Sequence, residues 1–330
     1  MHGLYLLWFV HERQFSPALV ASVLAVGDLS IIAFEIPTGW FADRFGHRRS
    51  LLLGSSAQVA GMLCCWLGHG IPSFIAASLL IALGDAFRSG ADQALLYRSC
   101  LAIGRVDAFQ AIEARTRAIE QVALVALVLI GGAIVHLWGF AAGWAGETLL
   151  CAAGLAIAVA MVEPPPARSP APERPDAGHR MGMLSLRMAA LVPPAAMLSA
   201  WSSAASFLLQ TASAEGAARM SVLVAAITLA EAAGAATAIR LAWSSVRAQW
   251  TLLSAGVLMG TMVLTWPSRL LPAVVGLSFL AGVAEPLRAA AIQRATSDGW
   301  RARAASAASA CDMLLSTLTL LLAGVWRTRR

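Results

Sequence analysis

Residues 35–50 read EIPTGWFADRFGHRRS and close the first long apolar run of the chain. Gly39 is expected to let two helices approach closely, and Gly46 to permit a tight turn with positive φ. Asp43 stands at the predicted end of a helix. Three bases, which can meet anionic lipid or neighbouring carboxylates, follow it: Arg44, Arg48 and Arg49. A basic loop that only follows the positive-inside rule is the simpler interpretation. The spacing of the glycines, the acid and the bases favours a loop with a specific structural role instead.

The composition around this loop indicates an integral membrane protein. Hydrophobic residues make up 58% of the 330 residues and charged residues 13%, with a mean hydropathy of +0.71. A soluble domain carries roughly 45–50% apolar and about 25% charged residues. The net charge of +6 comes from arginines in short gaps between apolar runs, not on one soluble face. We therefore predict a membrane protein without a nucleic-acid partner.

Apolar runs long enough to cross a bilayer, which needs about 20 residues per helix, define the predicted architecture. The predicted spans are 17–39, 50–69, 72–97, 119–137, 139–162, 187–210, 219–241, 249–267, 270–292 and 303–326. Residues 1–10 are apolar but too short to cross, because a helix rises about 1.5 Å per residue. The prediction is an all-α membrane fold with about ten full transmembrane helices and a partial first helix.

A proline-rich, charged segment divides the chain. It spans residues 163–186 and reads as a linker on the membrane surface, because it has little apolar surface to bury. The predicted domains are an N-terminal bundle (1–162), this linker and a C-terminal bundle (187–330). Placing the 39–50 loop in the cytoplasm puts most arginines on that side, as the positive-inside rule requires. The predicted location is the plasma (inner) membrane, with a cytoplasmic linker.

The loop resembles the G-x-x-x-D-R-x-G-R-R pattern of the major facilitator superfamily of secondary transporters. The matching positions are Gly39, Asp43, Arg44, Gly46, Arg48 and Arg49, and the preceding Glu35-Ile-Pro-Thr is similar to bacterial efflux-type members. The run SGADQALLY at 89–97 is similar to their fourth helix. Those members usually follow the tyrosine with an acid, where this chain has Arg98. The resemblance implies two six-helix bundles around a central cavity, related by a pseudo-twofold axis, with the loop as a conformational latch.

A repeated set of polar residues supports two related halves. Asp85, Arg88 and Gln93 recur as Glu285, Arg288 and Gln293 at a constant offset of 200 residues. Parallel repeats related by an axis along the membrane normal would produce such an offset. Three matching positions also arise by chance, so the repeat supports the prediction without proving it.

Charges inside the predicted spans are the candidate proton or substrate sites, because an ionised side chain at the centre of a helix costs about 2.5–3.5 kcal/mol. The candidates are Asp28, Glu35, Asp85, Arg88, Asp92, Glu231, Glu285 and Arg288, and Asp312 lies in the last span. Asp85–Arg88 and Glu285–Arg288 are spaced to form ion pairs on one helix face. They are either structural pairs, or part of a site in which Asp28 or Asp85 carries a proton. In the second case Asp85→Asn should abolish proton-driven flux.

Two other classes of function were weighed. An enzyme is disfavoured, because the histidines lie near span ends or in loops, no HExxH motif occurs, and the chain has no lysine for a Ser–Lys dyad. No catalytic residue, metal site or cofactor is predicted. The second class is a transport-incompetent fragment or membrane interaction protein, because ten spans and a partial helix fall short of the family's twelve.

The preferred prediction is proton-coupled efflux of an unidentified small molecule by alternating access. The expected partners are that substrate, protons and membrane lipids.

Overall fold

The computed structural model describes residues 4–89, 91–105, 108–164, 181–212, 216–240, 246–265, 270–295 and 298–328. This part of the chain is built from helices and contains no strand. Helices are expected in a bilayer, because each backbone N–H and C=O group must find its partner within the segment. The predicted all-α membrane fold is confirmed. The predicted linker falls mostly outside the described residues, since 165–180 are not among them.

The contacts within the chain define two compact units. Unit 1 comprises Met1–Tyr5 and Ser22–Pro170, and unit 2 comprises Leu6–Ala21 and Ala171–Arg330. The division falls inside helix α2 (Pro17–Phe45), whose first residues group with unit 2. The short helix α1 (Tyr5–Leu7) and the π-helix η1 (Trp8–Glu12) precede it. Each unit is described by itself below.

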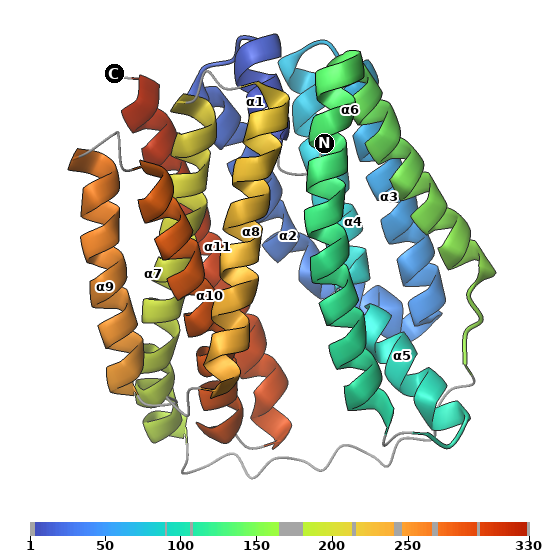
Figure 1. Cartoon of the computed structure of the whole chain (residues 1–330). Helices are drawn as coiled ribbons and strands as arrows, with labels where there is room; N and C mark the ends of the chain where they lie inside the picture. Colours follow the sequence, from blue (N-terminus) through green and yellow to red (C-terminus); the bar gives the residue numbers. More distant parts are fainter. Residues whose placement is uncertain are drawn as a thin grey trace. The chain divides into compact units, whose positions relative to one another are not determined.

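Unit 1 is organised around helix α3. Besides most of α2, its helices are α3 (His47–Leu67), α4 (Ile71–Arg88), α5 (Ala91–Ala102) and α6 (Phe109–Ala160). Helix α3 packs against α4, α5 and α6. Figure 1 shows these helices in blue to green.

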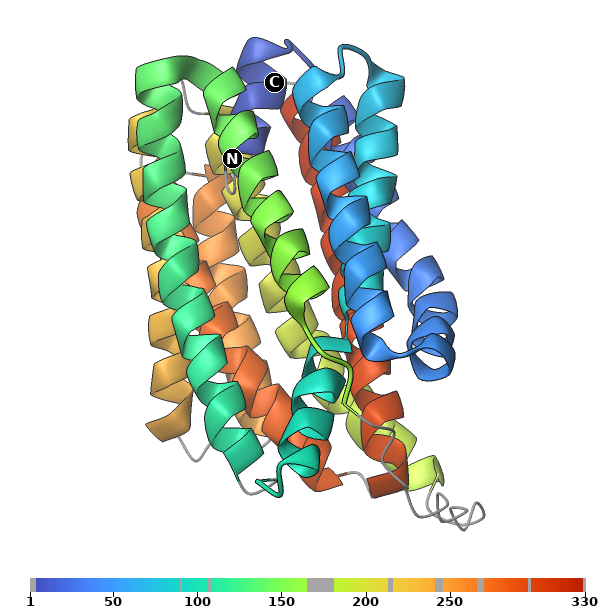
Figure 2. The same ribbon diagram turned by 90° about the vertical axis from the view of Figure 1, so that its right-hand side faces the viewer.

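Helix α6 is two helices joined at a glycine. Gly139 has φ 79° and ψ 175°, a conformation that is not helical and that L-residues with side chains rarely adopt. Figures 1 and 2 show that the chain turns back at the top of α6, so that two arms run side by side. The two arms correspond to the predicted spans 119–137 and 139–162.

The predicted span 72–97 is wrong as a single helix. Helix α4 ends at Arg88, where Ser89 has an extended ψ of 117°, and α5 begins at Ala91. Polar residues flank this break, namely Asp85, Arg88, Asp92 and Gln93, and the prediction extended one span across them.

Unit 2 is organised around helix α10. Its helices are α7 (Met181–Ala212), α8 (Ala217–Arg240), α9 (Val246–Thr265), α10 (Leu270–Ala295) and α11 (Asp298–Thr328). Helix α10 packs against α7, α8, α9 and α11. Its segment Leu271–Arg288 is 56% buried, more than any other candidate span, as a central helix requires. Leu198, Leu253 and Ala284 belong to one hydrophobic core between α7, α9 and α10.

Glycines permit the closest helix crossings in both units. In unit 1, a Cβ at Gly54 of α3 would lie 2.8 Å from the carbonyl oxygen of Gly84 in α4, and a Cβ at Gly84 equally close to that of Gly54. In unit 2, a Cβ at Gly282 of α10 would strike the backbone of Glu231 in α8. Small residues at such crossings are how transmembrane helices gain packing energy without a hydrophobic driving force.

Fewer clear spans are found than the ten predicted. Within the described residues, seven helical segments are long and apolar enough to cross a membrane: Pro17–Glu35, His47–Leu67, Ile71–Arg88, Val122–Ala160, Ala217–Ala238, Leu271–Arg288 and Ala310–Arg327. One of these, Val122–Ala160, contains both arms of α6. In α9, the apolar stretch found within the described residues is the shorter Trp250–Met259.

Candidate functional site

The loop that resembles the superfamily pattern forms a tight turn between α2 and α3. Gly46 has φ 98°, as predicted for this position, and its N–H donates to the carbonyl oxygen of Ala42 at 3.0 Å. No heavy atom outside Gly39 and its neighbours lies within 4 Å of a Cβ built there, so the close approach expected at this glycine is not observed in the described structure.

A carboxylate that sequence reasoning placed in the linker caps the start of α3. Glu163 accepts hydrogen bonds from the backbone N–H groups of His47 (3.2 Å to Oε1) and Arg48 (2.6 Å to Oε2). These are two of the N–H groups that a helix start leaves without partners, and the helix dipole favours an anion there. The Arg48 side chain donates to the carbonyl oxygen of Val159 at 2.6 Å. Glu163 therefore ties the loop to the end of α6.

Arg98 completes this cluster from α5. Its Nη1 lies 3.2 Å from Glu163 Oε1, and its Nη2 donates to the carbonyl oxygen of Pro164 at 3.2 Å. In the sequence, Arg98 stood where the resembling transporters carry an acid. The structure supplies the acid from Glu163, which follows 65 residues later. Its only sequence signal was a carboxylate directly after an apolar span.

The remaining loop residues behave differently. The Arg44 guanidinium lies 5.5 Å from the ring centroid of Trp40, a cation–π contact, and both residues are exposed. Arg49 is exposed. The side chain of Asp43 lies outside the described part of the structure.

The polar cluster of unit 1 is bridged by an amide. Gln58 of α3 donates from Nε2 to Asp85 Oδ1 at 2.6 Å and accepts from Arg88 Nη1 at its Oε1, at 2.7 Å. The described residues show no direct ion pair between Asp85 and Arg88, which the spacing allowed; the two side chains are linked through Gln58 instead. Arg88 itself is exposed. The thiol of Cys151, in the second arm of α6, interacts electrostatically with Asp85, Arg88 and Glu147.

The polar cluster of unit 2 is a direct charge network. Arg288 is 3% exposed; its Nη2 donates to Glu285 at 2.7 Å, and its Nη1 pairs with Asp312 of α11. The predicted Glu285–Arg288 pair is thus observed, with a second carboxylate added. The Arg288 Nε has no hydrogen-bond partner within the described structure.

Glu231 of α8 belongs to the same cluster. It interacts electrostatically with Glu285. The two helices touch where Gly282 meets the backbone of Glu231, one turn before Glu285. Glu285 and Asp312 pair with the single base Arg288, whereas Glu231 interacts with Glu285, and both glutamates are exposed. Together the three acids and one base have a formal charge of −2 when all are ionised (+1 − 3).

The other candidates lie apart from these clusters. Asp28 and Glu35 are half-buried in α2, and Asp92 is exposed in the first turn of α5. Gln58, a partner that sequence reasoning missed, was visible only as a polar residue inside an apolar span. Asp312 was visible as an acid in the last span, without a predicted partner.

Comparisons with known proteins place the chain in a family. A sequence model of the Major Facilitator Superfamily matches residues 1–320. No curated protein matches the chain. Among solved structures, the peptide transporter POT bound to alafosfalin is similar, with 13% identity and a TM-score of 0.73, over 99% of this chain and 84% of that one.

Two further solved structures have the same fold. A D-xylose–proton symporter has 14% identity and a TM-score of 0.68, over 97% of this chain and 83% of that one. A bacterial homolog of the human lysosomal transporter Spinster has 15% identity and a TM-score of 0.68, over 96% and 76%. At such identities the likeness shows the fold alone. With the family match over nearly the whole length, the chain belongs to the Major Facilitator Superfamily and is a multi-pass membrane transport protein.

Proposed function

We propose that this protein is a proton-coupled secondary transporter that exports a small molecule by alternating access. The proposal includes the plasma (inner) membrane as its location, and the bundles 1–162 and 187–330 as its moving parts, joined by a cytoplasmic linker. The similar structures support a small substrate, since one is of a D-xylose–proton symporter and another of a peptide transporter. Efflux as the direction is supported by the resemblance of the 35–50 segment to efflux-type members.

The excess of acid in the polar cluster of unit 2 is the observation that carries proton coupling. A buried carboxylate is stable as an anion only beside a base or hydrogen-bond donors. Arg288 can neutralise one of its two partners, Glu285 and Asp312, so the cluster retains an excess of negative charge. Uptake of a proton relieves that excess without breaking the ion pairs.

Glu231 is the proton carrier that we propose among the candidate acids. It faces the like charge of Glu285, and the described structure gives it no base as a partner. Asp85, by comparison, accepts a hydrogen bond from Gln58 in a cluster that also contains Arg88, which favours its ionised form. Asp28 and Asp85 remain competing candidates, and Asp28→Asn and Asp85→Asn in the same experiment distinguish them.

The Glu163 cluster supports the role of the 35–50 segment as a conformational latch. It gathers the start of α3, the end of α6 and Arg98 of α5 at one carboxylate. Such a cluster holds three helix ends in one arrangement, and breaking it would let them move separately. The latch residues proposed are Gly39, Asp43, Arg44, Gly46, Arg48 and Arg49, together with Glu163 and Arg98.

Flux into proteoliposomes under an imposed pH gradient tests the proposal. The purified chain would be reconstituted with a pH-sensitive dye inside and offered a panel of drugs, sugars and amino acids. We expect one compound class to move in exchange for protons, with substrate and dye signals linked. Glu231→Gln should abolish the gradient-driven component and leave exchange without a gradient intact.

Two matched variants complete the design. Glu12→Gln makes the same chemical change at an exposed residue of unit 2 outside the spans, and should behave as the unmodified protein does. Asp85→Asn tests the competing carrier. If Asp85→Asn abolishes coupling while Glu231→Gln does not, the carrier lies in unit 1. If no compound responds to the gradient, the coupling proposal is wrong.

A further inference from the structure

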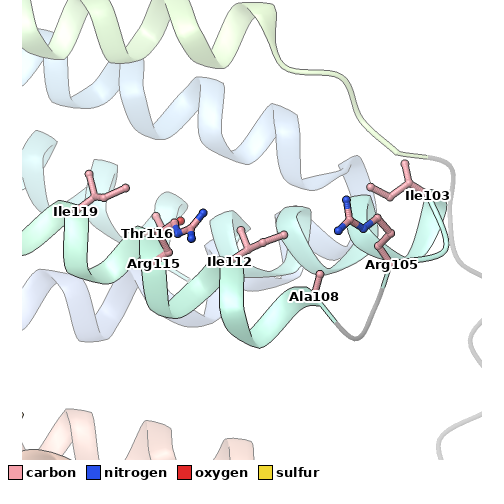
Figure 3. Close-up of a pocket in the computed structure, with 7 residues that line it drawn as sticks. All are labelled: Ile103, Arg105, Ala108, Ile112, Arg115, Thr116 and Ile119. Atoms are coloured by element: carbon pink, nitrogen blue, oxygen red, sulfur yellow. The ribbon is translucent and has the colours of Figure 1, made fainter.

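Another polar site of unit 1 shares no residue with its Gln58 and Glu163 clusters. It is a pocket of about 450 Å³ between the end of α5 and the start of α6. Ile112, Arg115, Thr116 and Ile119 follow the spacing i, i+3, i+4, i+7, which places them on one face of α6. Figure 3 shows these side chains along α6, with Ile103 and Arg105 at the connection that leads into the helix. We call this group the α5–α6 pocket.

Two positive charges line the pocket. Arg105 and Arg115 are exposed, and the described residues offer neither guanidinium an ion pair. The hydroxyl of Thr116 adds a hydrogen-bond donor beside Arg115, and Arg105 reaches the pocket from the connection at its other end (Figure 3). Guanidinium groups bind phosphate oxygens through paired N–H donors, and a neighbouring hydroxyl extends that set. An anion with several oxygens is therefore the ligand that the polar part of the pocket fits.

The rest of the pocket is apolar and incompletely covered. Ile103 is 68% exposed, Ile112 39% and Ile119 62%. The apolar face continues along α6 toward the bilayer, where Val122 is 72% exposed and Ile130 54%. A free phosphate ion would leave these isoleucines uncovered. A ligand with an anionic head and a hydrocarbon tail would cover both parts.

The depth of the pocket agrees with a lipid headgroup. The apolar span of α6 begins at Val122, seven residues after Arg115 (122 − 115) and three after Ile119. At about 1.5 Å per residue, Arg115 lies about 10 Å before the start of the span. The headgroup layer adds roughly 5–8 Å on each side of the hydrocarbon core. The long arginine side chain bridges the difference.

We propose that the α5–α6 pocket binds an anionic phospholipid. The phosphodiester contacts Arg105, Arg115 and Thr116, and one acyl chain lies along Ile112, Ile119 and the exposed face of α6. The site is independent of the proposed proton carrier and of the direction of transport.

Lipid binding to the purified full chain in a neutral detergent tests this proposal. Dioleoylphosphatidylglycerol and dioleoylphosphatidylcholine share acyl chains and differ in net charge, so bound lipid counted by native mass spectrometry isolates the headgroup. We expect the anionic lipid to bind more tightly. Arg105→Gln/Arg115→Gln should weaken it about 30-fold, since each arginine near an anionic headgroup contributes roughly fivefold. Arg219→Gln/Arg327→Gln removes the same charge elsewhere and should leave binding unchanged.

Two further arms separate a lipid from a free anion. Ile112→Ser/Ile119→Ser keeps both arginines and should weaken the anionic lipid by about tenfold or more, because acyl contacts are lost. Inorganic phosphate should compete only weakly. The proposal would be overturned if the two lipids bound equally, or if the control pair lost as much binding as the arginine pair. It would also be overturned if inorganic phosphate displaced the lipid fully and the isoleucine changes had no effect. The lipid comparison on the unmodified protein decides the matter even if a variant does not fold.

Discussion

The two polar clusters occupy equivalent positions in the sequence but are built differently. Asp85 and Arg88 of unit 1 are joined through the amide of Gln58, and Arg88 is exposed. Glu285 and Arg288 of unit 2 pair directly, and Arg288 is buried with a second carboxylate at its other nitrogen. The same spacing on one helix therefore leads to an amide-bridged polar group in one unit and to direct ion pairs around a buried arginine in the other.

The difference follows from what the neighbouring helices contribute. Helix α3 brings an uncharged amide to unit 1, whereas α8 and α11 bring carboxylates to unit 2. An amide can satisfy a carboxylate and a guanidinium together without adding charge. A third or fourth charged group changes the net charge of the cluster. The proton affinity of the cluster therefore depends more on the residues of the neighbouring helices than on the repeated acid–arginine pair.

The largest predicted difference concerns the arginines. Arg288→Gln leaves Glu285 and Asp312 without their base. Arg288 is buried, but Glu285 is exposed and Asp312 is half-buried, so we expect a loss of about 2–3 kcal/mol, below that of a fully buried pair. Arg88→Gln removes an exposed partner and should cost under about 1 kcal/mol. Thermal unfolding in detergent, followed by size-exclusion chromatography, measures both. Equal losses of stability in the two variants would refute the contrast between the clusters.

The next prediction concerns the helix crossing that places Glu231 beside Glu285. Gly282→Ala forces a Cβ into the backbone of α8 and should destabilise unit 2 by about 1–3 kcal/mol. It should also weaken proton coupling, because the two acids move apart. Gly39→Ala is the matched control, since a Cβ there meets no neighbour within 4 Å in the described structure. A comparable effect of Gly39→Ala would show that the crossing is not special.

A smaller effect is expected at the bridge of unit 1. Gln58→Leu keeps the size of the side chain but removes both hydrogen bonds to Asp85 and Arg88, which should cost about 1–2 kcal/mol. The measurement is the midpoint of thermal unfolding in detergent. Gln58→Glu sharpens the test, because a charged bridge pairs with Arg88 but repels Asp85. If the leucine variant is as stable as the unmodified protein, the bridge contributes nothing.

The smallest predicted effect lies at the Glu163 cluster. Glu163→Gln retains a carbonyl oxygen for one backbone N–H of α3 but loses the charge that faces Arg98 and the helix dipole, which should cost about 1 kcal/mol. Accessibility of a cysteine introduced at exposed Arg49 reports on the loop by its rate of alkylation. That rate should rise in Glu163→Gln, and an unchanged rate would remove Glu163 from the latch.

Much of the fold could be predicted from the sequence. The apolar runs located the helices of both units, and Gly46 was expected at a position of positive φ, where the structure has 98°. The end of α4 at Arg88 was not predicted, although Asp85, Arg88, Ser89 and Asp92 mark it, because the apolar residues on either side were joined into one span. The close approach expected at Gly39 was also wrong, whereas Gly54 and Gly84, which were not singled out, do meet.

The candidate sites were predicted less completely than the fold. Residues on one helix, such as Glu285 and Arg288, could be paired from spacing, because a helix brings positions three apart to the same face. Gln58, Asp312 and Glu163 join their partners from other helices, 24 to 116 residues away in the chain. No periodicity links such positions.

The sequence by itself determined that this chain is a bundle of membrane helices with a basic, glycine-containing loop and a few charges inside the spans. These are local properties, because a segment in lipid must satisfy its own backbone and each intramembrane charge is visible as an exception. Only the tertiary structure decided which charges meet. The position of a neighbouring helix depends on packing at crossings such as Gly282 and Glu231, and that packing sets the charge of each cluster.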